Sequence, residues 1–155
     1  MADLEVVVAG GGNAALCAAI TAREKGAAVT LFESAPENMR GGNTRHTRNL
    51  RASHAEPLET LEDSYTEDEF WEDILKVTHG NTDETLTRLM IRHSPSLLSW
   101  LKARDVHFQP ALSGTLSLHR TNAFFLGGGK TLLNKLYSHA EKVGVNVIYD
   151  SEVTS

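Results

Sequence analysis

Cysteine is almost absent from this sequence, since Cys17 is the only one among 155 residues. A single cysteine excludes a disulfide within the chain, and such sparse usage fits a reducing compartment. The sequence shows no electropositive neighbour that would activate the thiol. We therefore expect Cys17 to be a small core residue and not a nucleophile.

Long apolar runs are missing as well. No stretch approaches the roughly 20 consecutive apolar residues that cross a bilayer, so no transmembrane segment is predicted. The first five residues include two acids and lead directly into an apolar run, which is unlike a signal peptide. The expected location is therefore cytoplasmic.

Two further absences limit the ligands of the protein. The net charge is −5, which argues against a general nucleic-acid surface. The seven histidines are dispersed, and none has convincing metal-ligand spacing to a cysteine or an acid. We expect neither a nucleic-acid partner nor a bound metal.

The N-terminal region contains a glycine-rich motif. The apolar run at residues 6–9 leads into residues 10–15, Gly-Gly-Gly-Asn-Ala-Ala, and a stretch typical of a helix follows. In a dinucleotide-binding βαβ unit, Gly10 would make the tight turn and Gly12 would let the backbone approach a pyrophosphate. Ala15, in place of a third glycine, would let helix and strand pack closely.

An acid follows the next apolar run at the expected distance. Glu33 lies about 20 residues past the glycines, where it would accept hydrogen bonds from a ribose diol and repel the 2′-phosphate of NADP. The unpaired N–H groups and the dipole at the start of the preceding helix would favour a pyrophosphate. Two alternatives remain open: a structural crossover with an incidental glycine turn, and Glu33 as an ordinary solvated acid.

Charge is sharply segregated in the next part of the chain. Residues 38–55 contain four arginines and no acid, whereas residues 56–73 contain nine acids and neither Lys nor Arg. The basic segment either faces an anion or forms a solvated loop that pairs with the acidic segment. The sequence favours neither interpretation.

Helical patterns dominate the middle of the chain. Residues 66–69 have the capping-box pattern Thr-x-x-Glu, which predicts a helix start. A second helix is predicted from about Asp83, with Leu86, Leu89 and Met90 on one face. Ser94-Pro95 predicts the start of a third helix, as a cap followed by the first helical residue.

The C-terminal part indicates alternating strands and helices. Short strands are predicted at residues 106–108 and 115–118, and an amphipathic helix at residues 130–143. Gly144 would end that helix before a last strand at residues 145–148. The predicted fold class is therefore α/β, a Rossmann-like domain with a parallel sheet, and by length the chain is expected to form one domain.

Three glycines at residues 127–129 precede Lys130 and Thr131. A P-loop would need a glycine where Phe124 stands, so the phosphate cradle of that motif would be incomplete and we reject it. An anion or flavin contact and a simple tight turn both remain open for this loop.

Read in order, these motifs resemble a known family. Residues 6–15, Glu33, the run Arg-Gly-Gly-Asn-Thr-Arg-His-Thr-Arg-Asn-Leu-Arg at 40–51, residues 124–134 and residues 150–153 together resemble the FAD-binding start of fumarate reductase/succinate dehydrogenase-type flavoproteins. The tricarballylate dehydrogenase branch of that family is the most similar. The run at 40–51 is the most specific motif, because plain nicotinamide-binding domains lack it.

The resemblance implies a set of residues that hold FAD. These residues are Gly10, Gly11, Gly12, Asn13, Ala14, Glu33, Gly41, Gly42, Asn43, Thr44 and Val153. It also implies a substrate role for Arg48 and Arg51, which would attract a polycarboxylate. Some family members attach FAD covalently through a histidine in this region, but the local pattern around His46 departs from theirs, so non-covalent FAD is predicted.

The implied activity is hydride transfer between a small di- or tricarboxylate and flavin N5, with a separate electron acceptor, either a protein or a quinone-linked partner. Such a partner would place the protein at the periphery of the inner membrane.

Family members are several hundred residues long, so the chain is expected to be the N-terminal part of an FAD domain without a capping domain, and incomplete for catalysis. The rivals are an NAD-binding domain of a dehydrogenase and a non-catalytic nucleotide-binding module.

Overall fold

The computed structural model describes residues 4–111 and 118–154. Those residues form two compact units, one made of residues 4–47 and 127–154 and the other of residues 48–111 and 118–126. We call them unit 1 and unit 2 and describe each by itself. None of the helices described in them is both long enough and apolar enough to cross a membrane.

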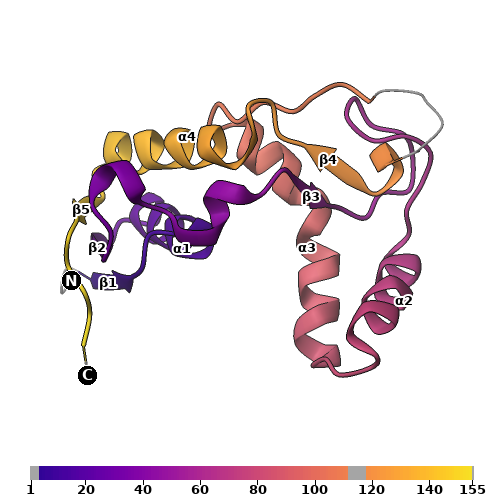
Figure 1. Ribbon diagram of the computed structural model, residues 1–155, viewed down its shortest axis with the longest axis horizontal. Coiled ribbons are helices and arrows are strands. Elements are labelled where there is room, and N and C mark those ends of the chain that lie inside the picture. The colour runs from indigo at the N-terminus through magenta and orange to yellow at the C-terminus, as the bar shows by residue number, and fades with distance from the viewer. Residues whose placement is uncertain (1–3, 112–117, 155) are drawn as a thin grey trace. The chain divides into compact units, whose positions relative to one another are not determined.

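Unit 1 is an α/β unit with a parallel sheet (Figure 1). Its elements are β1 (Glu5–Ala9), α1 (Asn13–Glu24), β2 (Ala28–Phe32), the short 3₁₀ helices η1 (Glu37–Met39) and η2 (Gly42–His46), α4 (Gly128–Val143) and β5 (Asn146–Ile148). The strand order is β1-β2-β5, and both pairings are parallel. The predicted α/β class with a parallel sheet is confirmed.

The two long helices of unit 1 pack against each other, as Figure 1 shows. Their apolar faces carry Leu16 and Ile20 on α1, and Leu132 and Leu136 on α4, all of them buried. Arg23 joins their C-terminal ends, because its Nε donates to the Val143 carbonyl at 3.0 Å. A cation beside the last carbonyls of a helix is also favoured by the helix dipole.

The described part of unit 2 contains two α-helices, a short 3₁₀ helix and a small antiparallel ribbon. Its elements are β3 (Asn49–Arg51), α2 (Glu67–Thr78), α3 (Glu84–Lys102), the 3₁₀ helix η3 (Leu118–Arg120) and β4 (Asn122–Phe124), and β3 pairs with β4. The predicted capping box at the start of α2 is confirmed: the Thr66 side chain accepts from the Glu69 amide, and the Glu69 side chain accepts from the Thr66 amide. Tyr65, Phe70 and Ile91 form a buried cluster beside it.

The predicted helix boundary at Ser94-Pro95 is wrong, because α3 runs through both residues. Pro95 has no N–H, so the Ile91 carbonyl lacks its helical donor. Two hydroxyls replace that donor: Ser94 Oγ donates to this oxygen at 2.7 Å, and Ser53 Oγ at 3.3 Å. Because the carbonyl remains bonded, the helix continues.

The helix predicted from about Asp83 is confirmed, because Asp83 caps α3. Leu86, Leu89 and Met90 lie on one face as predicted; this face is exposed, and the buried face carries Thr87, Ile91, Ser94, Leu98 and Leu101. The two predicted strands need correction. Residues 106–108 form no strand, only an isolated bridge between Phe108 and Phe125. In the second predicted strand, Leu118 belongs to η3, and residues 115–117 lie outside the described residues.

Candidate functional site

The N-terminus of α1 has the geometry of an anion site. Gly10 has φ of 97°, a left-handed conformation that favours glycine, and turns the chain from β1 toward the helix. Gly12 caps α1 without a side-chain hydrogen bond, and the first turn carries no acid. The Ala14 and Ala15 N–H groups have no acceptor in the described part of the chain. These N–H groups are therefore available to a phosphate oxygen.

Gly11 has a packing role that the sequence did not reveal. A Cβ atom at this position would overlap both the Tyr137 hydroxyl and Glu33 Oε2. The close approach lets Tyr137 donate a hydrogen bond to the Gly11 carbonyl at 2.8 Å. This glycine therefore permits the glycine-rich loop to contact α4 and the end of β2.

Glu33 is buried, with 6% of its surface exposed, so the alternative of an ordinary solvated acid is wrong. Its Oε1 accepts from the Ala35 amide at 3.0 Å and from Ser34 Oγ at 3.4 Å. Its Oε2 accepts from the Gly41 amide at 3.0 Å and from the Tyr137 hydroxyl at 3.4 Å. Four donors thus surround the carboxylate.

These contacts keep the carboxylate ionised. Burial by itself raises the pKa of Glu33, but the hydrogen bonds from Ala35, Gly41, Ser34 and Tyr137 outweigh it and hold the pKa below its usual value. The adjacent Tyr137 has a raised pKa, chiefly because it is buried and also because it faces the Glu33 charge. At neutral pH the pair is therefore a carboxylate and a neutral hydroxyl donor.

The second predicted loop, residues 41–44, is brought to the start of α1. Thr44 Oγ1 accepts from the Asn13 amide at 3.1 Å, and the Gly41 amide is bonded to Glu33. Gly41 has φ of 96°, and a Cβ there would overlap Leu133 of α4. Gly42 and Asn43 are exposed within the same loop. The fold therefore gathers the two glycine-rich loops and Glu33 in one place.

Val153 lies in the segment that follows β5. This segment runs beside the end of β2, because the Ser151 amide donates to the Glu33 carbonyl at 3.1 Å. Val153 is exposed. All eleven residues predicted to hold FAD thus belong to unit 1.

The glycines at residues 127–129 allow close packing at the start of α4. Gly127 and Gly128 have positive φ, and a Cβ at Gly129 would overlap the Thr44 carbonyl and crowd that of Thr47. The close approach seats the start of α4 on η2, the helix that contains most of the second loop. The structure thus shows a tight turn with a packing role, and the interpretation as an anion or flavin contact stays a prediction.

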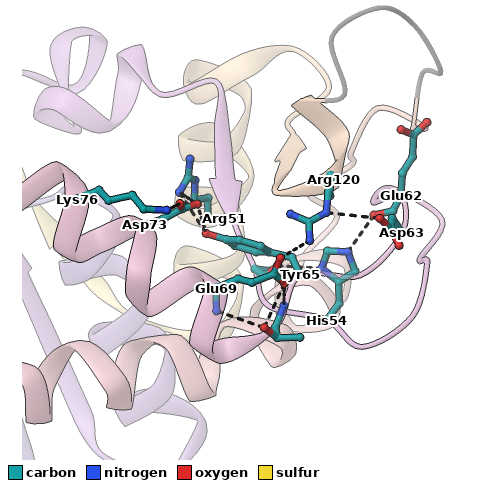
Figure 2. Close-up of polar contacts among 11 residues, drawn as sticks. Arg51, His54, Glu62, Asp63, Tyr65, Glu69, Asp73, Lys76 and Arg120 are labelled. Carbon is teal, nitrogen blue, oxygen red and sulfur yellow. Dashed lines mark hydrogen bonds and ion pairs between the residues drawn. The ribbon is translucent and has the colours of Figure 1, made fainter.

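The predicted substrate arginines belong to unit 2. Arg48 is exposed, whereas the Arg51 guanidinium donates to Asp73 Oδ2 and to the Tyr65 hydroxyl, each at 3.2 Å. Figure 2 shows this network, with Tyr65 also donating to Asp73 at 2.8 Å. Burial and the bond to Asp73 raise the pKa of Tyr65 to about 12. A substrate carboxylate at Arg51 would compete with Asp73.

The basic and acidic segments pair in part. Arg51 and Asp73 form one ion pair between them. Arg120 pairs with the acidic segment as well, at 2.5 Å from Glu69 and 3.5 Å from Asp63 (Figure 2). Arg40 and Arg45 remain in unit 1. No group of three or more potential metal ligands occurs among the described residues.

Comparison with known proteins identifies the family. Residues 5–153 match the family described as FAD binding domain. The NADH:fumarate oxidoreductase of Klebsiella pneumoniae (strain 342) is 30% identical, over 96% of this chain and 16% of that protein. The fumarate reductase (cytochrome) of Shewanella frigidimarina is 26% identical, over 93% of this chain and 26% of that protein.

A solved structure supports the fold. The 3-ketosteroid-delta4-(5alpha)-dehydrogenase of Rhodococcus jostii RHA1 is similar with a TM-score of 0.74 at 22% identity, over 96% of this chain and 38% of that one. The chain thus spans less than half the length of each of these proteins.

Proposed function

The chain belongs to the FAD binding domain family, and we propose that it binds FAD non-covalently at the start of α1. The observation that carries the proposal is the uncapped helix N-terminus behind Gly10, with the Ala14 and Ala15 N–H groups available to a pyrophosphate. Gly41 to Thr44 lie beside it and would line the path from the pyrophosphate to the flavin. The residues present therefore fit the cofactor.

Glu33 would hold the adenosine ribose. Two of its four hydrogen bonds, from Ser34 and Tyr137, are long at 3.4 Å, whereas the two from backbone amides are 3.0 Å. Ribose hydroxyls would replace the two weak donors and leave the backbone amides in place. Because the carboxylate stays charged, a 2′-phosphate would be repelled. The exposed Val153 would contribute backbone contacts to the adenine.

The proposed reaction is the interconversion of a C–C and a C=C bond in a small di- or tricarboxylate such as tricarballylate or succinate. When bound, FAD supplies the hydride chemistry at flavin N5, and the protein supplies orientation and electrostatics. The names of two relatives include fumarate, which supports a substrate of this class. Arg48 and Arg51 would attract its carboxylates. We further propose that the chain is the N-terminal part of the catalytic protein and that a capping domain completes the site.

A separate electron acceptor or donor would complete the cycle. One relative is named for NADH and another for a cytochrome, which supports a partner that carries electrons. A quinone-linked partner is the alternative, and would place the protein beside the inner membrane.

A flavin titration tests the cofactor. We expect the purified chain to show absorption bands in the blue and near-ultraviolet, or to acquire them on addition of FAD, and we expect acid precipitation to release the flavin. A chain that stays colourless with FAD but binds NAD would contradict the proposal. Flavin that remains on the precipitated protein, and is lost in His46→Ala, would contradict non-covalent binding.

A second titration tests the substrate class. Tricarballylate and succinate are added to the FAD-loaded complete protein, with its capping domain, and binding is followed by the flavin spectrum and by calorimetry. We expect Arg48→Ala and Arg51→Ala to weaken binding at least tenfold, with exposed Arg92→Ala of the same unit as the matched control. Equal affinity in all four proteins would contradict a role for these arginines.

A further inference from the structure

Unit 1 contains a concave site of about 550 Å³, which is lined by none of the eleven residues assigned to FAD. Its polar lining comes from η1, η2, α4 and the adjoining loop: Glu37, Asn38, Arg40, Arg45, Lys130 and Asn134. Small-molecule pockets are typically about 300–1,000 Å³, so the cavity is large enough for a small metabolite.

The lining is strongly unbalanced in charge. Three cations, Arg40, Arg45 and Lys130, face one acid, Glu37. Glu37 lies 3.4 Å from Arg40 Nη1, but 72% of its side chain is exposed. An exposed acid at this distance contributes little, because water screens the pair. The lining therefore retains an excess of positive charge.

Arg40 is fixed in place within this lining. Its side chain is only 17% exposed, its Nη1 donates to the Tyr149 hydroxyl at 2.6 Å, and its guanidinium carbon lies 4.1 Å from the centre of the Tyr137 ring. Arg45 is held by a bond from its Nη1 to the Asn38 carbonyl at 3.1 Å. Two guanidinium groups held in this way can bind carboxylate or phosphate with little further loss of side-chain freedom.

Lys130 is an independent indication of an anion. It lies in the first turn of α4, where the helix dipole disfavours a cation, and no acid occupies that turn. No hydrogen bond or ion pair is formed by its side chain in the described chain, and the side chain is exposed. A bound anion would neutralise this unfavourable charge.

We propose that this cavity binds a small multiply charged anion that carries carboxylate or phosphate groups, at a site separate from the FAD site. The anion would contact Arg40, Arg45 and Lys130, with the Asn134 amide as a further donor. In this proposal the basic segment of the sequence faces an anion through its first two arginines, together with a lysine that lies far along the chain.

Calorimetric titration tests the proposal with two probes, inorganic pyrophosphate and citrate, each added to the chain with and without saturating FAD. The probe with the lower Kd will show whether the cavity prefers phosphate or carboxylate groups. Lys130→Gln and Arg45→Gln are each expected to raise its Kd at least tenfold while leaving the Kd for FAD unchanged. Lys142→Gln, in the last turn of the same helix, is the matched control and should bind the probe as the unaltered chain does.

Three outcomes would overturn the proposal. Neither probe binds the unaltered chain, or Lys142→Gln weakens the binding of the probe as much as Lys130→Gln does, or saturating FAD abolishes the binding of the probe. The last outcome would mean that the probe binds at the FAD site and not at a separate cavity. Failure of the chain to bind FAD would contradict the proposed function alone, because the FAD-free titrations would still test the anion site.

Discussion

At the scale of single residues, the candidate site depends on how closely groups approach one another. Gly11 illustrates this, because Tyr137 and Glu33 both occupy the space that a side chain would fill. Gly12, only one residue further on, has room for a Cβ, whose nearest neighbour would be Thr44 Oγ1 at 3.5 Å. The two adjacent glycines therefore have different reasons to be glycine.

Gly11→Ala is expected to lower the free energy of unfolding by about 1–3 kcal/mol, the usual cost of overpacking a buried position. Gly12→Ala should leave the unfolding free energy nearly unchanged but weaken the binding of FAD, because the added Cβ atom would stand where the backbone approaches the pyrophosphate. Urea unfolding without FAD and a flavin titration measure the two effects.

The double variant Gly11→Ala/Tyr137→Phe provides the control, since removing the hydroxyl relieves one of the two overlaps. It should lose less stability than the sum of the two single variants. Two results would contradict the close contact of Gly11 with Tyr137 and Glu33. The losses of unfolding free energy in the two single variants could add up in the double variant, or Gly12→Ala could be as unstable as Gly11→Ala.

At the scale of elements, the capping box of α2 should make stability depend on pH. The Thr66 backbone amide and Arg120 hold the pKa of Glu69 down, at about 2 in the folded protein against an ordinary 4.5. Because the folded pKa is the lower one, the unfolded chain binds more protons between these values, and stability rises with pH across this window. The contribution is complete above about pH 4.5 and is lost as pH falls toward 2.

Glu69→Gln should therefore be less stable than the unaltered chain at pH 6, and the difference should shrink as the pH falls toward 2. Urea unfolding at several pH values measures the difference. Glu67→Gln, in the same first turn, serves as control. A deficit for Glu69→Gln that does not change with pH would contradict the ionised cap.

Another element-scale prediction concerns the proline in α3. Ser94→Ala removes the closer donor to the Ile91 carbonyl and the acceptor for the Ser53 amide, which bonds Ser94 Oγ at 2.9 Å. Buried groups left unpaired cost about 1–3 kcal/mol, so a loss of unfolding free energy in that range is expected.

Ser96→Ala is the matched control, because its hydroxyl bonds the His93 carbonyl on the exposed side of the same helix. Denaturant titration of the two variants compares them. Equal stability of both proteins would show that Ser53 alone satisfies the Ile91 carbonyl.

At the scale of the whole molecule, the predicted cofactor residues all belong to unit 1 and the predicted substrate arginines to unit 2. FAD should therefore slow amide hydrogen exchange at the start of α1 and in the loop at residues 41–44. Mass spectrometry of peptides from both units measures this. Slowing that is confined to unit 2 would contradict the assignment of the FAD site.

The residues alone predict the α/β class, the helix–glycine–strand order of unit 1 and the capping box of α2. These features are local, because hydrophobic periodicity, glycine turns and caps act within a few residues of the chain.

Packing decides the features that join distant segments, among them the position of the second glycine-rich loop beside Glu33 and the start of α1. Tyr137 reaches Gly11 from 126 positions along the chain, two serines keep α3 continuous through Pro95, and Lys130 meets Arg40 and Arg45 at one cavity. No local pattern encodes such contacts. They depend on which side chains packing brings together, and on which carbonyls and charges it leaves in need of a partner.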